Sequence, residues 1–177
     1  KVCPRKCTEM SHHVVFAVAA HPDDIELMMA GTLLMLARAG CELHYINLCN
    51  GSMGTADHDP ATIAAIRAKE AREAARILGA TWHPPMVDDL DLYYDRTLPR
   101  RLGAIIRDVR PTIMLLQSPR DYIEDHMNAF RIAVTAAFNM YLQLRYKTTA
   151  RIEPNRAAWH LALDISELTA LMFLTGG

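Results

Sequence analysis

The sequence lacks any apolar run of the roughly 18 residues that a membrane-spanning helix needs. It also lacks an excess of charge of one sign, because 19 Lys and Arg stand against 20 Asp and Glu. The basic footprint of a nucleic-acid-binding domain is therefore missing. The polar segment Lys1–His13, broken by Pro4, does not have the pattern of a secretion signal. The four cysteines are dispersed and match no zinc-binding framework. We expect no membrane span, no nucleic-acid partner and a reducing, cytoplasmic environment.

The composition is that of a globular protein with a full core. Hydrophobic residues make up 51% of the chain and charged residues 22%, which excludes disorder. A length of 177 residues suits one compact domain. No repeat or Gly/Ser-rich linker divides the sequence. We expect an N-terminal extension over residues 1–13 and a single domain over residues 14–177.

Strand-like and helix-like segments alternate along the chain. Apolar runs rich in β-branched residues predict buried strands, and amphipathic runs ending at Gly or Pro predict helices. The predicted strands are Val14–Ala20, Glu42–Leu48, Thr81–Val87, Thr112–Gln117 and Trp159–Ile165. The predicted helices are Ile25–Ala39, Pro60–Leu78, Leu98–Val109 and Asp125–Leu144. This alternation predicts an α/β fold with a mostly parallel sheet and helices on both faces.

Two loops at the carboxyl ends of predicted strands have the composition of a functional site. His21-Pro22-Asp23-Asp24 follows the first strand, and the Ser118–His126 loop follows Thr112–Gln117. In parallel sheets, ligands bind beyond the carboxyl ends of the strands, where the strand order reverses. If the two strands are neighbours, the two loops face each other at this place.

These loops contain the ligand types of a catalytic zinc site, which uses three protein ligands and leaves a position for water. The turn at Pro22 would aim His21 and Asp24 at one point, and His126 would supply the third ligand. Asp23 would then lie beside the open position and take a proton from the water. The alternative is structural: Asp23 and Asp24 cap the following helix, and His126 is an ordinary hydrogen-bonded histidine.

Four segments together resemble the LmbE-like or PIG-L family of N-deacetylases. They are Ala20–Asp24 (AHPDD), Asn50–Gly54 (NGSMG), Arg67–Gly79 (RAKEAREAARILG) and Asp121–His126 (DYIEDH). The resemblance extends from Val14 to Phe138. It implies a Rossmann-like three-layer fold and removal of an acyl group, usually acetyl, from an amino sugar or its conjugate.

The resemblance also implies roles for particular residues. Zinc would be bound by His21, Asp24 and His126, with Asp23 as the general base. Arg67 would point toward the pocket, although it also suits an ordinary helix surface. Beyond the resemblance, two further residues are candidates. Asp125 would orient a ligand, or would cap a helix. Tyr122 would donate to the oxyanion, or would simply pack in its loop.

Two departures from the family pattern motivate an alternative function. Ile123 stands where many members have a histidine that serves the oxyanion or the leaving amine. The chain is also short for the family, so we expect a C-terminally shortened form. The alternative is a zinc-binding protein of the same fold with weak or no activity. A dinucleotide-binding domain is disfavoured because no Gly-x-Gly follows the first strand. The expected partner is a small N-acyl amino sugar, and the apolar helices could support a homo-oligomer.

Overall fold

The computed structural model describes residues 13–146. The chain divides into two compact units, Lys1–Leu142 and Gln143–Gly177, and the fold described here is that of the first unit. The elements, in order, are β1 (Val14–Ala19), α1 (Asp24–Met28), α2 (Ala30–Arg38), β2 (Glu42–Asn47), α3 (Pro60–Leu78), β3 (Thr81–His83), α4 (Leu98–Val109), β4 (Ile113–Leu116) and α5 (Glu124–Tyr146). No helix among residues 13–146 has the length and apolar character needed to cross a membrane.

The four described strands form one parallel sheet in the order β3-β2-β1-β4. The chain moves outward from β1 through β2 to β3 and then crosses back to place β4 on the other side of β1. The strand order therefore reverses between β1 and β4. These are the two strands whose following loops the sequence selects, and their direct pairing meets the condition under which the two loops face each other.

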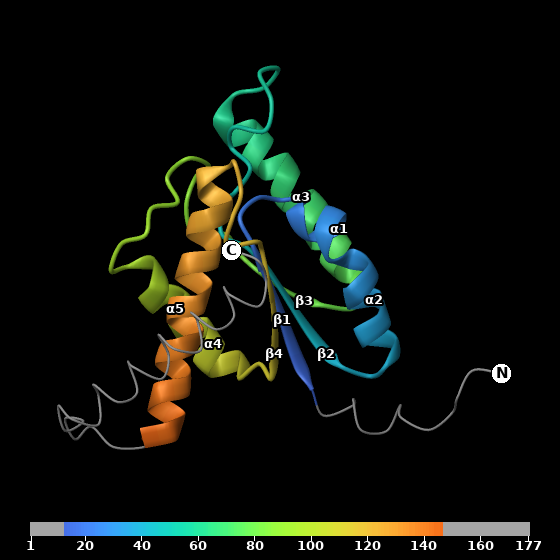
Figure 1. Cartoon of the computed structure of the whole chain (residues 1–177). Helices are drawn as coiled ribbons and strands as arrows, with labels where there is room; N and C mark the ends of the chain where they lie inside the picture. Colours follow the sequence, from blue (N-terminus) through green and yellow to red (C-terminus); the bar gives the residue numbers. More distant parts are fainter. Residues whose placement is uncertain (1–12, 147–177) are drawn as a thin grey trace. The chain divides into compact units, whose positions relative to one another are not determined.

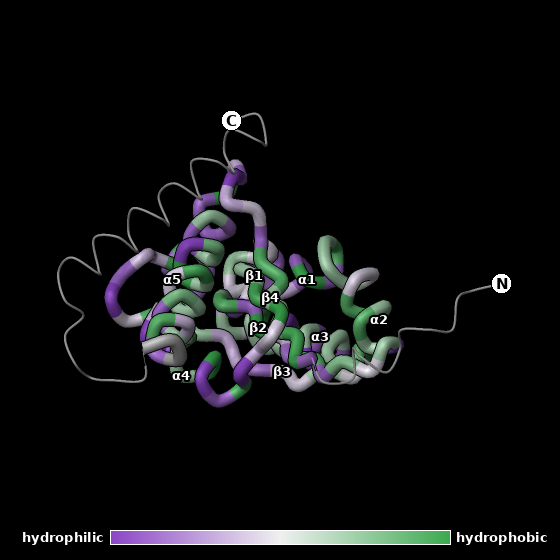
Figure 2. Tube along the Cα trace, turned by 60° about the horizontal axis from the view of Figure 1, so that its bottom comes forward, coloured by the Kyte–Doolittle hydropathy of each residue, from purple (hydrophilic) through white to green (hydrophobic). Residues whose placement is uncertain are grey.

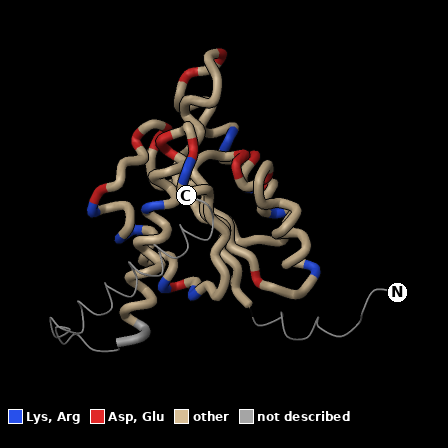
Figure 3. The backbone as a smooth tube through the Cα atoms, viewed as in Figure 1, with Lys and Arg blue, Asp and Glu red and all other residues tan. Residues whose placement is uncertain are grey.

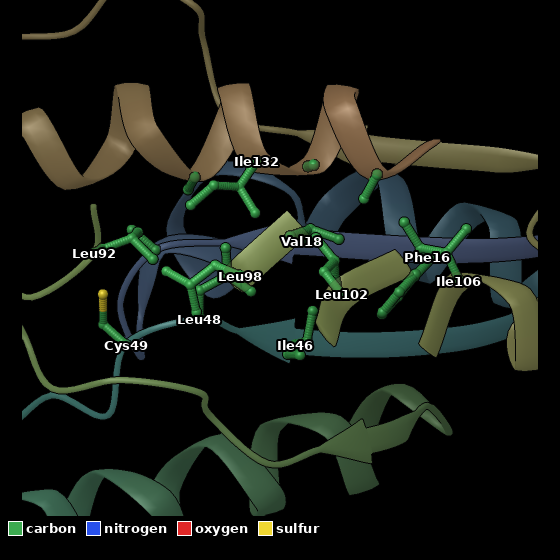
Figure 4. Close-up of a cluster of buried hydrophobic side chains, with 14 residues drawn as sticks. Phe16, Val18, Ile46, Leu48, Cys49, Leu92, Leu98, Leu102, Ile106 and Ile132 are labelled. Carbon is green, nitrogen blue, oxygen red and sulfur yellow. The ribbon is translucent and has the colours of Figure 1, made fainter. Parts of the chain in front are cut away.

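Two apolar cores lie on opposite faces of the sheet, because β1 is buried on both faces and its side chains alternate. Phe16 and Val18 contribute to the core that contains residues of α4 and α5, and Figure 4 shows them with Leu102, Ile106 and Ile132. Val15, Ala17 and Ala19 contribute to the second core, with residues of α1, α2 and α3. Figures 1 and 2 show the strands between these two groups of helices. The predicted three-layer α/β fold is confirmed.

Helix α3 begins and ends where the sequence predicts. The Asp59 side chain accepts hydrogen bonds from the amides of Ala61 and Thr62, both at 3.1 Å, and Pro60 occupies the first turn. The helix ends at Gly79, whose φ of 70° lies in the left-handed region that favours glycine.

Some predicted boundaries are wrong. The helix predicted over Ile25–Ala39 is interrupted at Met29, where φ is −122° and the backbone leaves the helical region. The strand predicted over Thr81–Val87 ends at His83, because the two prolines that follow cannot donate to a ladder. One isolated bridge between Cys49 and Val87 resumes the pairing.

Other predictions fall partly or wholly outside the described residues. The strand predicted over Thr112–Gln117 is present as β4, but it is only partly buried because it is an edge strand among the described residues. The strand predicted over Trp159–Ile165 lies outside the described residues, and the single domain over residues 14–177 stays a prediction.

Candidate metal centre and its pocket

The loop that follows β1 is held in place by the ends of the two neighbouring strands. Asn47, the last residue of β2, donates its side-chain amide to the carbonyl of His21 at 2.5 Å. Gln117, directly after β4, accepts a hydrogen bond from the amide of Ala20 at 2.8 Å. Both side chains are buried. The backbone beside His21 is therefore anchored on two sides at the place where the strand order reverses.

The turn itself has an unusual backbone. Asp23 adopts φ of 108°, a left-handed conformation that is uncommon for residues other than glycine. Its side chain makes no capping hydrogen bond to α1, so the interpretation of Asp23 as a side-chain helix cap is wrong. Asp24 instead turns back and accepts a hydrogen bond from the amide of His21 at 2.7 Å. This closes the turn and fixes the Asp24 carboxylate beside the His21 ring.

The three predicted ligands converge on one point. His21 Nδ1 lies 3.3 Å from His126 Nε2 and 3.7 Å from Asp24 Oδ2. His126 Nε2 lies 3.3 Å from Asp24 Oδ1. A tetrahedral zinc with ligand distances of 2.0–2.2 Å would space its donor atoms about 3.4 Å apart. The observed separations match this spacing without rearrangement.

The outer nitrogens of both histidines face carboxylates. His21 Nε2 lies 3.0 Å from Asp125 Oδ2, and His126 Nδ1 lies 2.9 Å from Asp121 Oδ2. A histidine that binds a metal usually donates its other N–H to a carboxylate or carbonyl, which fixes the tautomer and orients the ring. The arrangement therefore aims His21 Nδ1 and His126 Nε2 at the common point.

The electrostatics of this point favour a cation. Burial alone would lower the pKa of His21, but the hydrogen bonds to Asp24 and Asp125 outweigh burial and raise the pKa to about 9. Burial alone would raise the pKa of Asp24, and its hydrogen bonds with His21 reverse this and hold the pKa below its usual value. Figure 3 shows acidic residues gathered at the loops above the sheet. The surroundings that hold a proton on His21 would equally stabilise a divalent ion.

A second group of potential ligands, His21, Cys49 and Asp89, is less suited to a metal. Burial raises the pKa of the Cys49 thiol far above its usual value, whereas a metal binds the thiolate. The two carboxylate oxygens of Asp89 already accept hydrogen bonds from the amides of Gly51 and Met53, at 2.7 and 2.9 Å. The donor set that fits zinc is therefore His21, Asp24 and His126.

Arg67 of α3 is among the residues that line the pocket, and the glycine-containing loop packs against it. Gly51 has φ of 81°, and a Cβ on it would lie 2.7 Å from Arg67 Cγ. A Cβ on Gly54 would lie 3.3 Å from Arg67 Nε. The loop backbone thus packs directly against the Arg67 side chain. The guanidinium lies 3.8 Å from Asp23 Oδ2 and 3.0 Å from Glu70.

The pocket around these groups has a volume of about 630 Å³. Its lining contains five aspartates and one arginine besides the two histidines, namely Asp23, Asp24, Asp89, Asp121, Asp125 and Arg67. Ile123 also lines the pocket, so the position of the missing histidine is apolar inside the site. Tyr122 lies at the pocket edge and is 96% exposed. Its role at the oxyanion stays a prediction, because no described residue holds its side chain over the site.

Sequence reasoning missed Asp89 as the residue that fastens the glycine loop, and it gave Asp121 no role. Asp121 is contained in the DYIEDH segment, five residues before His126, and a search for carboxylates near a predicted ligand would have found it. Asp89 follows the bridge between Cys49 and Val87 at the carboxyl edge of the sheet. The two loops were selected because they follow strands at the carboxyl edge of the sheet. The same criterion would have selected Asp89 if the sequence had indicated that the chain returns to this edge after Pro84-Pro85.

The fold and the site together define a Rossmann-like α/β protein with a candidate metal centre at the switch point of its sheet. The chain belongs to the PIG-L family, since the family model described as "PIG-L: GlcNAc-PI de-N-acetylase" matches residues 16–137. The resemblance recognised from the motifs is thereby confirmed.

Relatives of this chain include deacetylases and a hydratase. The diacetylchitobiose deacetylase of Thermococcus kodakarensis is 33% identical over 115 residues, covering 63% of this chain and 43% of that protein. The solved N,N'-diacetylchitobiose deacetylase of Pyrococcus horikoshii matches with a TM-score of 0.68 and 30% identity, over 74% of this chain and 51% of that one. The 4-carboxy-2-hydroxymuconate hydratase of Pseudomonas putida matches with a TM-score of 0.70 and 27% identity, over 79% and 61%. The chain thus spans 43% to 61% of the lengths of these proteins.

Proposed function

We propose that this protein is a zinc-dependent amidase that removes an N-acetyl group from an amino sugar or its conjugate. The convergence of His21 Nδ1, His126 Nε2 and the Asp24 carboxylate, at separations of 3.3 to 3.7 Å, supports this proposal most directly. Membership of the PIG-L family and similarity to two diacetylchitobiose deacetylases support the reaction class.

Each residue of the site has a task in this reaction. A zinc ion held by His21, Asp24 and His126 would polarise the amide carbonyl and lower the pKa of water. Asp121 and Asp125 face the outer nitrogens of the two histidine rings and so orient the inner nitrogens toward the metal position, where the ion would replace a proton.

Asp23 serves as general base and then as general acid. Its side chain is half exposed, so solvent and substrate can reach it. Burial, followed by the charge of Asp24, raises the pKa of Asp23 above its usual value, against the lowering effect of Arg67. A carboxylate with a raised pKa is a better base near neutral pH. Asp23 takes the proton of the attacking water and delivers it to the nitrogen as the amide C–N bond breaks.

With an isoleucine at position 123, the charge on the carbonyl oxygen needs another donor. Among the described residues that line the pocket, Arg67 is the one Lys or Arg, and the glycine loop packs against the aliphatic part of its side chain. We propose that Arg67 contacts the substrate, by donating a hydrogen bond to a sugar hydroxyl or to the developing oxyanion. Tyr122 can share this task only if its exposed ring folds over the bound substrate.

Two other functions compete with this proposal. Similarity to a hydratase favours addition of water to a carbon–carbon double bond, which also needs a base beside the activated water. The apolar Ile123 favours a metal-binding protein with little activity. The cytoplasmic location and a homo-oligomeric state stay predictions from the sequence.

Acetate release from N-acetylglucosamine conjugates by the zinc-loaded protein separates these possibilities. Asp23→Asn should retain zinc and the fold and lose about 10²–10⁴-fold in kcat. Asp108→Asn, at an exposed position on α4 outside the pocket lining, is the matched control and should keep the wild-type rate. Hydration of an unsaturated carboxylic acid without acetate release would assign the protein to the hydratases. Zinc binding with neither activity would support the inactive form.

A further inference from the structure

The pocket has an apolar rim above its acidic floor. The rim consists of five large, exposed side chains that line the same pocket as the candidate metal ligands, namely Leu27, Met28, Met53, Leu90 and Tyr122. Their exposed fractions run from 53% for Met28 to 96% for Tyr122. They come from four separate segments: α1, the glycine loop, the loop after β3 and the loop before α5. Apolar surface gathered from four segments around one opening indicates a binding surface, since single exposed hydrophobic residues are ordinarily scattered.

Leu90 is held on this rim at a conformational cost. Its φ of 68° places a bulky side chain in the left-handed region, which is rare outside glycine and asparagine. The Leu90 amide donates to Asp125 Oδ2 at 2.9 Å, and the same oxygen lies 3.0 Å from His21 Nε2. The carboxylate that orients a candidate metal ligand therefore also holds the backbone from which this apolar side chain projects beside the pocket. Strained residues of this kind cluster at ligand sites.

The polar floor and the apolar rim of the pocket suit a ligand that has both a polar and an apolar part. The floor provides carboxylates, histidines and Arg67, which suit an amide and sugar hydroxyls. The rim provides methyl, thioether and aromatic surface, which gains more from an apolar group than from sugar hydroxyls. A volume of about 630 Å³ lies within the range for sites that take a drug-sized ligand. It therefore has room for a group attached to the sugar.

We propose that the rim binds an apolar aglycone, so that the substrate class is an N-acetyl amino sugar linked to an aliphatic or aromatic group. This inference rests on the proposed function, because the sugar is placed by the deacetylase site. The aglycone is favoured over a protein partner as occupant because the rim is continuous with the lining of the pocket that holds the candidate metal centre.

Binding of methyl and hexyl glycosides of N-acetylglucosamine tests the inference directly. Calorimetry on the zinc-loaded Asp23→Asn protein keeps both probes intact. Burial of a methylene is worth at most about a fourfold change in Kd. Because the rim stays partly open to solvent, we expect the hexyl glycoside to bind about 10- to 100-fold more tightly than the methyl glycoside.

A rim variant and a matched control make the assignment specific. Leu27→Ser with Met53→Ser should reduce the preference for the hexyl glycoside to less than about threefold, because the polar side chains remove the apolar contact area. Met35→Ser with Ile77→Ser changes side chains that are 72% and 66% exposed but lie outside this pocket lining, and should leave the preference unchanged.

The inference is overturned if both glycosides bind equally, if neither binds, or if the rim variant changes the oligomeric mass and leaves the preference intact. Failure of the proposed function looks different. In that case the wild-type protein releases no acetate from either glycoside, whatever the ratio of the two dissociation constants.

Discussion

Replacing Gly51 with alanine tests whether the glycine loop positions Arg67. The residue has φ of 81°, and its amide donates to Asp89 Oδ1 at 2.7 Å, so the loop cannot easily turn away. An alanine Cβ would lie 2.7 Å from Arg67 Cγ and 2.9 Å from Arg67 Cβ. The latter atom is fixed to the backbone of α3. Either the loop moves outward, or the Arg67 side chain leaves its rotamer.

The substitution costs stability through the backbone of residue 51 and through the Arg67 side chain. A left-handed conformation costs an alanine about 1–2 kcal/mol, and a side chain forced off its rotamer costs about 0.5–1.5 kcal/mol. The two costs together give an expected loss of about 1.5–3.5 kcal/mol, which a domain with a stability of about 5–15 kcal/mol survives. The midpoint of thermal unfolding should fall by about 3–14 °C. We also expect kcat/KM to fall, and zinc binding to weaken less, because the Cβ would lie 3.2 Å from Pro22 Cγ in the turn that holds His21 and Asp24 but much nearer to the Arg67 side chain.

Gly31→Ala is the matched control. Gly31 is exposed in α2, and a Cβ there would meet nothing within 4 Å. Alanine should stabilise the helix by up to about 1 kcal/mol. Circular dichroism melts of the two variants, with zinc content and acetate release measured on the same samples, give the result. If Gly51→Ala melts with the wild type and keeps full activity, the loop does not hold Arg67.

Three further predictions address the metal ligands and the core. Asp121→Asn should weaken zinc binding by about 10- to 100-fold in a chelator competition, because the His126 ring loses its carboxylate partner; unchanged affinity would remove Asp121 from the site. The raised pKa of His21, about 9 against 6.5, means that its contribution to the stability of the metal-free protein is complete below pH 6.5 and is lost as the pH rises through 9. Thermal melts of chelator-treated protein across this window should show the decline, and a flat profile would refute the pairing. Ile132→Ala should cost about 2–5 kcal/mol in urea unfolding because Ile132 is fully buried on α5, whereas Val134→Ala, 41% exposed on the same helix, should cost far less.

The sequence predicts the fold well where one signal dominates. Helix α3 has an aspartate cap, a first-turn proline and a terminal glycine, and its bounds agree with the prediction to the residue. The strand before His21 is recognisable because an apolar run without alternation requires burial on both faces. The break at Met29 escapes detection because neither proline nor glycine marks that residue, and helical periodicity continues through it.

The sequence predicts the position of a site residue when that position follows from its place at the end of a strand. His21, Asp24 and His126 follow neighbouring strands, so topology alone brings them together. The orientation of Asp23 depends on a left-handed φ that is not encoded by a glycine. The role of Asp89 depends on a loop after Pro84-Pro85 whose path is set by tertiary contacts.

The central claim is that His21, Asp24 and His126 hold one zinc ion, and zinc stoichiometry tests it most directly. The protein and its His126→Ala variant would be loaded with zinc, dialysed and analysed by plasma emission spectrometry, with the fold checked by circular dichroism. The variant would lose one of three ligands and leave His21 as the remaining imidazole beside the Asp24 carboxylate. We predict one zinc per wild-type chain and less than about 0.2 per folded variant chain, since structures with only two protein ligands rarely retain zinc. One zinc per chain in the folded His126→Ala variant would contradict the account.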